Sequence, residues 1–331
     1  MSVFTIAKLI PNNQAPSIIN EVCFSPDGKT FCATYEYNNE VRLYSARTKA
    51  LLRTFKNPGA ALNGPHGVLL TKKHLIVANK GTSPCQFCIF NLADDTGTPV
   101  FSYTTPYAHL AEGHSIALHG RCLVVTYCEG LGKEGAIVSY DYDDENGRII
   151  GPMDKQERWF SAYGDVKGVS FNKAGDKVYV TFQSDLMPWG RKAIKRLKNL
   201  VSGGTRGGPS RNGIAVFSID QRGRFSSKPL WKKIFRTHCR LENIHIQGNR
   251  ALVTNPDGGC IQLYDLRKNR PFDSPPQVIG DNLVFPHGAK ISPDGQQLLV
   301  SDNGIDTVDH QPLWTTFVSP RRDRLLIFKI Q

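Results

Sequence analysis

Paired hydrophobic segments recur six times along the chain, and each pair follows the same order. An apolar strand is followed by a tight turn, a second apolar strand that ends in a step such as Ala-Thr, Val-Thr or Val-Ser, and a third strand of alternating apolar and polar residues. The turns are rich in Gly, Asn, Asp and Lys, which suit tight hairpins. The six copies begin at Asn20, His66, His114, Lys167, Asn243 and His287.

The spacing of these copies predicts the fold. The starts are 44 to 53 residues apart, except for one interval of 76 residues after the fourth start. A fourth strand follows in most copies, and four strands at this period are typical of propeller blades. We therefore predict an all-β protein in which residues 1–331 form a single six-bladed β-propeller. A seventh blade hidden in the 76-residue interval is the alternative.

The two ends of the chain are predicted to close the ring. The sixth copy ends after its third strand, LLIFKIQ, and SVFTIAKLI at the start is a strand without a copy of its own. We expect this N-terminal strand to supply the missing fourth strand of the last blade, which removes an exposed sheet edge. Helix content should be small, with one candidate helix at Arg191–Val201.

Composition places the chain among soluble proteins of a reducing compartment. Apolar residues make up 40% of its 331 residues, enough for a sizeable core without disulfides. The first residues lack the pattern of a signal peptide, and no apolar run is long enough for a membrane span. The eight cysteines are scattered rather than arranged as a disulfide framework. We predict a cytoplasmic location and no membrane partner.

The formal net charge of +12 bears on possible partners. It indicates either an anionic partner or plain solubility. The most basic run, RKAIKRLK from Arg191, lacks interleaved aromatic residues, so nucleic acid is not the favoured partner. A small-molecule substrate, either neutral or anionic, is the working hypothesis.

Propeller geometry predicts which face carries a site. The loop into the first strand of a blade and the loop out of its second strand lie at the same end of the central channel. The first-strand starts named above, including Asn20 and Asn243 as binding residues, should therefore meet the second-strand ends at one mouth. Two insertions, 184–213 and 304–324, should overhang this mouth and bring Trp189 and Trp314 to a ligand.

Three histidines at equivalent positions suggest a metal site at this mouth. His66, His114 and His287 would hold a divalent cation, with Asp302 or Glu36 completing the ligand set. A set of oxygen ligands, Glu36, Asn79, Asn255 and Asp302, is the alternative and would suit Ca²⁺. A third reading is structural, because loop histidines in WD-type propellers belong to hydrogen-bond networks within a blade. Only three copies carry this histidine, and the Gly-His and Trp-Asp pairing of WD repeats is absent.

Metal-free acid–base chemistry is a further possibility for the same residues. A histidine at a partly desolvated mouth titrates near neutral pH and can act as general acid or base. Lys167 would stabilise a developing oxyanion, and Tyr127 would donate a proton. The chain has no Gly-x-Ser-x-Gly elbow, which argues against a serine hydrolase.

Several repeats resemble those of YVTN and lactonase-type propellers. The matching segments are NEVCFSPDGKTFCATYE from Asn20, VTNPDGGCIQLYDL from Val253 and PHGAKISPDGQQLLVSDNG from Pro286. That superfamily includes sugar-lactone hydrolases, streptogramin-opening lyases, strictosidine-synthase-like enzymes, ring-alkylating propellers and binding scaffolds. The resemblance implies a metal held by Glu, Asn and Asp, for which Glu21 or Glu36, Asn79, Asn255 and Asp302 stand at suitable places. The three histidines depart from that pattern.

Two functions follow as hypotheses. The first is a small-molecule enzyme of lactonase, lyase or cyclase type, with acid–base chemistry at the channel mouth and one divalent cation or none. The second is a scaffold without catalysis that binds a partner protein through the same basic, loop-rich face. Fold alone does not separate them.

Overall fold

A computed structural model describes most of the chain. The described residues are 3–11, 18–56, 61–128, 135–160, 165–183, 212–235, 240–280, 283–306 and 317–331, and of 304–306 and 317–322 the backbone alone is described. The predicted helix at 191–201, as well as Trp189 and Trp314, lies outside these residues.

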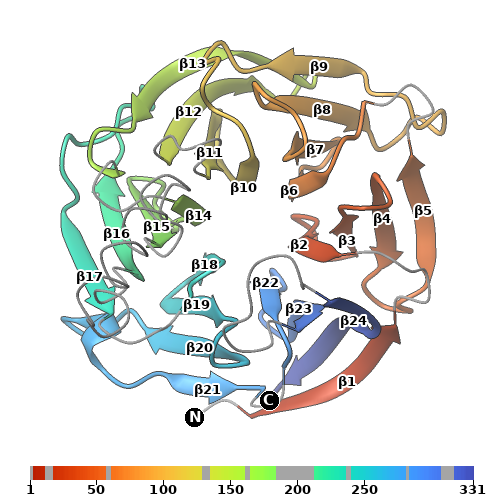
Figure 1. The fold of residues 1–331 in the computed structure, drawn as a ribbon, viewed down its shortest axis with the longest axis vertical. Coiled ribbons are helices and arrows are strands. Elements are labelled where there is room, and N and C mark those ends of the chain that lie inside the picture. Colours follow the sequence, from red (N-terminus) through yellow and green to blue (C-terminus); the bar gives the residue numbers. More distant parts are fainter. Residues whose placement is uncertain are drawn as a thin grey trace, which may run out of the picture.

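Six antiparallel four-stranded sheets surround a central axis (Figure 1). Blade one contains β2 (Ile19–Phe24), β3 (Thr30–Tyr35), β4 (Glu40–Ser45) and β5 (Leu51–Lys56). Blade two contains β6 (Pro65–Leu70), β7 (His74–Asn79), β8 (Gln86–Asn91) and β9 (Phe101–Thr104). Blade three contains β10 (Gly113–His119), β11 (Cys122–Tyr127), β12 (Ala136–Asp143) and β13 (Arg148–Gln156).

The second half of the ring repeats this order. Blade four contains β14 (Asp165–Phe171), β15 (Lys177–Gln183), β16 (Asn212–Ser218) and β17 (Trp231–Phe235). Blade five contains β18 (Ile244–Gln247), β19 (Arg250–Asn255), β20 (Cys260–Asp265) and β21 (Gln277–Ile279), with the short 3₁₀ turn η2 (Pro271–Asp273) between the last two. Blade six contains β22 (Pro286–Ile291), β23 (Gln297–Asp306), β24 (Phe317–Ile330) and β1 (Phe4–Pro11). The all-β, six-bladed fold is thus confirmed.

The N-terminal strand closes the ring as predicted. β1 pairs antiparallel with β24, from Phe4 opposite Ile330 to Pro11 opposite Arg324. Figure 1 shows β1 as the outermost strand of the blade that also contains the C-terminus. Non-covalent pairing of the two chain ends therefore holds blade six against blade one. Within the described part of the chain, no helix is long and apolar enough to cross a membrane.

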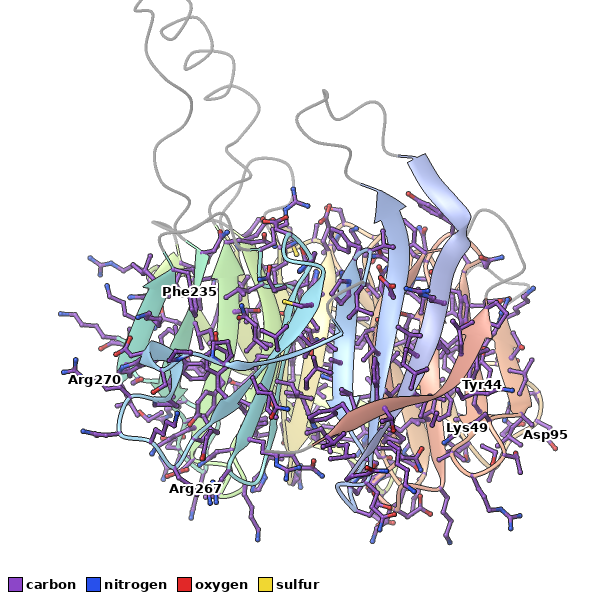
Figure 2. The ribbon with its side chains drawn as sticks, turned by 90° about the horizontal axis from the view of Figure 1, so that it is seen from below. Tyr44, Lys49, Asp95, Phe235, Arg267 and Arg270 are labelled. Carbon is purple, nitrogen blue, oxygen red and sulfur yellow. The ribbon has the colours of Figure 1, made fainter. Side chains whose placement is uncertain are left out.

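The predicted boundaries of the two insertions need correction. Asn212 and Gly213 already belong to β16, where they pair with β17. The stretch 304–324 contains the ends of two long strands, because Ile305 pairs with Val318 and Asp306 with Phe317. Figure 2 shows β23 and β24 rising above the other blades on one face. Backbone pairing here continues the hairpin, where the sequence analysis expected a loop.

Hydroxyl groups at the end of the second strands link neighbouring blades. Thr34 in blade one donates to the backbone carbonyl of His66 in blade two at 3.1 Å, and Thr254 in blade five donates to that of His287 in blade six at 3.0 Å. Thr126 and Ser301 make the same bond to Lys167 and Asn20. Each of these hydroxyls also accepts a backbone N–H from the first strand of its own blade. The recurrent Thr or Ser of the repeat therefore fixes the position of the next blade's inner strand along the channel axis.

Glycines allow three of the inner strands to lie close to their neighbours. A Cβ atom on Gly168 would lie 2.5 Å from the backbone nitrogen of Ile244 in the next blade. One on Gly67 would lie 3.1 Å from the carbonyl oxygen of His114, and one on Gly288 2.9 Å from that of Asn20. The dipeptides His-Gly and Lys-Gly of the repeat thus combine a polar residue at the channel with close blade packing.

Candidate functional site

The polar residues at the start of the inner strands form a ring at one mouth of the channel. We call this mouth, on the side where β23 and β24 extend, the upper mouth. In five inner strands the pairing with the second strand is interrupted at this point, for example between Pro65 and Gly67 and between Gly113 and Ile116. Such bulges re-aim side chains. They turn Asn20, His66, His114, Lys167 and His287 out of the regular strand alternation.

The residue of blade five in this ring is Glu242, which the sequence analysis missed. We call the position of Asn20 in blade one, and the equivalent position in each other blade, the ring position. In blades one, three, four and six the residue after it donates its backbone N–H to the Thr or Ser hydroxyl of the second strand. In blade five that donor is Asn243, so the ring position is one residue earlier, at Glu242. The repeat alignment was wrong by one residue because β18 lacks a bulge and starts later, at Ile244.

The three histidines at the upper mouth converge. The imidazole centroids of His66 and His114 are 4.0 Å apart, and the centroid of His287 lies 4.8 Å from that of His66 and 5.3 Å from that of His114. All three side chains are buried, and one nitrogen from each lies within 4.8 Å of the other two. Blade six is therefore close enough to complete a three-histidine cluster with blades two and three.

The hydrogen bonds of the cluster leave ring nitrogens free. Nδ1 of His66 donates to the backbone carbonyl of His114 at 2.8 Å, so its Nε2 carries the lone pair. Nε2 of His114 and of His287 lie 3.4 Å and 3.7 Å from Oε2 of Glu242. Nδ1 of His114 and of His287 are buried without a partner. Buried polar atoms without partners are rare in native proteins, and these two nitrogens have lone pairs available to a ligand.

Burial keeps the histidines neutral. It lowers the pKa of His66 well below its usual range, with the neighbouring histidines adding to the effect. Burial and the nearby Lys167 lower the pKa of His114 to about 3, and burial lowers that of His287 to about 4. Neutral imidazoles are the form that binds metal ions.

Glu242 is the anionic centre of the cluster. Its burial opposes ionisation, but Lys167 and the His114 donor outweigh burial and hold the pKa of Glu242 well below its usual range. Gln183, at the end of β15, donates to Oε1 at 3.1 Å. Lys167 lies 3.9 Å from Glu242 and 3.5 Å from Asp165. The carboxylate therefore faces two histidines with one oxygen and is fixed by Gln183 through the other.

Ionisable groups around the histidines are more often acidic than basic. Four carboxyl groups and two lysines interact across this mouth among the described residues, namely Glu36, Glu112, Asp165, Glu242, Lys80 and Lys167. With the histidines neutral, this leaves an excess of two negative charges. The balance of these six described groups favours a cation at the cluster.

A second polar layer lies below the ring and closes the channel. The residues after the ring positions in blades one, three and five are Glu21, Ser115 and Asn243, where the other blades have glycine. Asn243 donates to both oxygens of Glu21, at 2.9 and 2.8 Å, and Lys290 approaches Glu21 to 3.3 Å from the next layer. We call Glu21, Ser115, Asn243 and Lys290 the plug. Asn243 is thus part of the plug, and its predicted role in ligand binding at the mouth has no support in this position.

Tyr127 does not lie at the mouth. Successive side chains of β11 alternate, and Thr126 takes the side that faces blade four. Tyr127 takes the opposite side, where it is fully buried in the core between blades two and three and hydrogen-bonds to Tyr140 at 2.6 Å. The predicted role as proton donor is therefore wrong.

The oxygen ligand set does not assemble. Asp302 accepts two backbone N–H groups through Oδ1 and pairs with Arg324 through Oδ2. Asn79 bonds to the backbone of Ala61 and Asn63, and Asn255 accepts the N–H of Gly258. These side chains hold loops of their own blades. Glu36 is at the mouth, where it accepts from Asn20 at 2.5 Å and pairs with Lys80.

Comparisons with known proteins support the fold. No family model matches the chain, and no curated protein matches it. A solved structure of a luciferin-regenerating enzyme aligns with a TM-score of 0.63 at 10% identity over 100% of this chain and 95% of that one. Hydrazine synthase of Kuenenia stuttgartiensis aligns with a TM-score of 0.56 at 11% identity over 90% and 95%. The WD40 repeats of RRP9 align with a TM-score of 0.58 at 9% identity over 99% and 100%. Two proteins named as enzymes and a set of WD40 repeats thus share this architecture.

Proposed function

We propose that this chain is a small-molecule enzyme whose upper mouth holds a divalent transition-metal ion on His66, His114 and His287. The observation that carries the proposal is the convergence of three buried neutral imidazoles, two of which have a buried Nδ1 without a partner. Three nitrogen donors suit zinc, iron, cobalt, nickel or copper, whereas Ca²⁺ prefers oxygen donors.

The outer contacts of the cluster support this assignment. Metal-binding histidines usually donate their second ring nitrogen to a carboxylate or a backbone carbonyl. His66 has the carbonyl of His114 for this purpose, and His114 and His287 share Oε2 of Glu242. Zinc–nitrogen bonds of about 2.0–2.1 Å would draw the rings closer together than their present separation.

The bound ion would supply Lewis acidity, which lowers the pKa of water and polarises a carbonyl or ether oxygen. The protein's own groups would do the rest. Glu242 would hold the rings of His114 and His287 in one orientation. The ammonium of Lys167, anchored by Asp165 and Glu242, would stabilise negative charge on a reacting oxygen. Below them, the plug closes the site from the other end of the channel.

The substrate class follows from this chemistry and from the repeats. Two excess negative charges are offset by the divalent ion, so the occupied mouth would suit a neutral or weakly anionic molecule. The similarity of the repeats to lactonase-type propellers favours a cyclic ester or related C–O bond, opened by hydrolysis or elimination. Seven described cysteines are free thiols, and we place the protein in the cytoplasm on this basis.

Metal-dependent turnover tests the enzyme function. Protein stripped by a chelator and reloaded with Zn²⁺, Co²⁺, Mn²⁺ or Fe²⁺ would be assayed on a panel of lactones and esters. We expect turnover in the reloaded wild type, none in the stripped protein and none in His114→Ala. His109→Ala is the matched control, because His109 pairs with Glu157 away from the cluster and should leave turnover unchanged. Equal turnover in all preparations would exclude the proposed centre.

A further inference from the structure

A large pocket opens at the opposite end of the channel, below the plug. We call this end the lower mouth. Figure 2 shows Arg267, in the turn after β20, on this side of the molecule. The pocket has a volume of about 840 Å³ and is lined by the ends of the inner strands from all six blades. Pockets of this size hold drug-sized molecules.

The closed end of this pocket is partly polar. The lining residues near the plug include one from each inner strand, namely Cys23, Leu69, Ala117, Ser170, His245 and Lys290. Lys290 reaches Glu21 and Asn243 of the plug at 3.3 and 3.4 Å and lines the pocket from above. Nε2 of His245 is buried and has no hydrogen-bond partner. Burial and the nearby Lys290 lower the pKa of His245 to about 3, so this imidazole is neutral.

The middle of the pocket is apolar. Phe24, Leu118 and Phe171 contribute to its wall, together with Ile246 and Ile291 from blades five and six. These residues follow the polar layer by one position in their strands. Contact with such a wall would stabilise an aromatic or aliphatic group by about 25 cal/mol for each Å² removed from water.

The open end is basic. Lys72 and Lys173 are exposed lining residues from blades two and four, and Asp144 is the acidic lining residue. The charge of Lys290 is balanced by Glu21 of the plug. The remaining charged lining groups, Lys72, Lys173 and Asp144, leave an excess of one positive charge. The net charge of these groups is therefore opposite in sign to that of the six described groups counted at the upper mouth.

We propose that the lower mouth is a second ligand site, which binds a small organic acid with an aromatic or aliphatic body. The acidic group would lie among Lys72 and Lys173, the apolar body against Phe24, Leu118 and Phe171, and a polar atom would face His245. The plug separates this site from the histidine cluster, so the inference does not depend on the proposed enzyme function.

Fluorescence titration with anilinonaphthalene sulfonate tests the site, because this probe combines an acidic group with an aromatic body. We expect one saturable site in the wild type. The double variant Lys72→Glu/Lys173→Glu should weaken binding on the order of tenfold, since two nearby attractive charges become repulsive. The matched control is Arg222→Glu/Lys228→Glu, which reverses two exposed charges outside the pocket and should change affinity less than twofold (about 0.4 kcal/mol).

Two further measurements fix the position and chemistry of the site. His114→Ala, in the upper mouth, should leave probe affinity unchanged. Naphthoate should displace the probe from the wild type at lower concentration than naphthalenemethanol, which keeps the test decisive if a variant fails to fold. The proposal is overturned if no saturable binding occurs, if affinity follows His114→Ala instead of the lysine variant, or if the alcohol competes as well as the acid.

Discussion

The residue of blade five at the upper mouth, Glu242, contacts three neighbouring side chains. One oxygen faces His114 and His287, and the other accepts from Gln183. This geometry assigns Glu242 a positioning role for two imidazoles. Its contribution should therefore depend on its charge and on its contact with the rings, and both can be removed with little change in shape.

Glu242→Gln should weaken metal binding by about 10–100-fold, the usual loss when an outer acceptor of a metal-binding histidine is changed. The measurement is competition with a chromogenic chelator. Glu112→Gln serves as the control, because Glu112 lies at the same mouth and interacts there with Lys80 and Lys167 rather than with a histidine. If both variants lose affinity equally, Glu242 acts through charge alone and the positioning role is wrong.

For single residues of the upper mouth, the sequence predicted some positions correctly and others not. Five ring residues could be identified because each starts a recognisable repeat, and Lys167 and the three histidines lie where the alignment put them. Glu242 was missed because the other five inner strands contain a bulge and β18 does not, which shifts the repeat alignment of blade five by one residue. A bulge does not change the pattern of hydrophobic residues, so the sequence did not reveal the shift. Tyr127 was misplaced because alternation within β11 decides its direction, and a hydroxyl at a strand end can face either core or channel.

Between elements, the contacts of inner strands depend on small residues. Gly168 lies against the backbone of Ile244 and Asn243, which cannot move aside as a side chain can. The strand β14 therefore tolerates no Cβ atom at this point.

Gly168→Ala should destabilise the protein by about 1–3 kcal/mol, in the range of overpacked cores. Gly151→Ala in β13 is the control, because a Cβ atom there meets nothing within 4 Å. Chemical denaturation of both variants gives the comparison. A Gly168→Ala protein as stable as Gly151→Ala would show that blades four and five are less closely packed than described.

The inter-blade hydroxyls make a second prediction about elements. Thr254→Val should cost about 2–4 kcal/mol, because the buried N–H of Asn243 and the carbonyl of His287 both lose a partner. Thr104→Val, on the exposed side of the outer strand β9, should be nearly neutral. Thermal unfolding measures the difference, and similar midpoints for the two variants would contradict the role of the hydroxyl.

Strands and their order were the most predictable level. Apolar runs indicate the first two strands of each blade, and alternating residues indicate the third. The short turns require that consecutive strands pair as hairpins. The ends of the two insertions were less predictable, because the extended hairpin of β23 and β24 has the mixed composition of a loop. The function of the recurrent Thr became clear only when the neighbouring blade was in place.

For the whole molecule, closure depends on one strand. β1 is held by pairing with β24 and contributes Phe4 and Ile10 to the cores of blade six and its neighbour. Ring closure was predictable because the last repeat lacked one strand and the chain start offered one.

Removal of residues 1–11 should therefore expose the edge of β24, lower the unfolding temperature and cause self-association. Size-exclusion chromatography would detect the associated species. Ile6→Lys/Leu9→Lys is the control, since both side chains are exposed at 62% and 41% and the strand keeps its backbone pairing. A monomeric, equally stable truncated protein would show that β1 is dispensable for closure.

The described charged groups at the two mouths of the channel differ in sign, although the chain as a whole is basic. Among the described residues, carboxyl groups outnumber lysines around the three neutral histidines of the upper mouth, and exposed lysines line the apolar pocket of the lower mouth. Glu21 and its partners in the plug separate them. The two ends of the channel thus differ in chemistry, and the proposed function depends on the histidine cluster.

The most direct measurement of the central claim is the metal content of the purified protein after exposure to Zn²⁺, Co²⁺ and Fe²⁺ and removal of excess ion. We predict close to one ion per chain for the wild type, and essentially none for the variant His114→Ala/His287→Ala in its folded form. Equal metal content in both proteins, or none in a folded wild type, would contradict a metal centre on His66, His114 and His287.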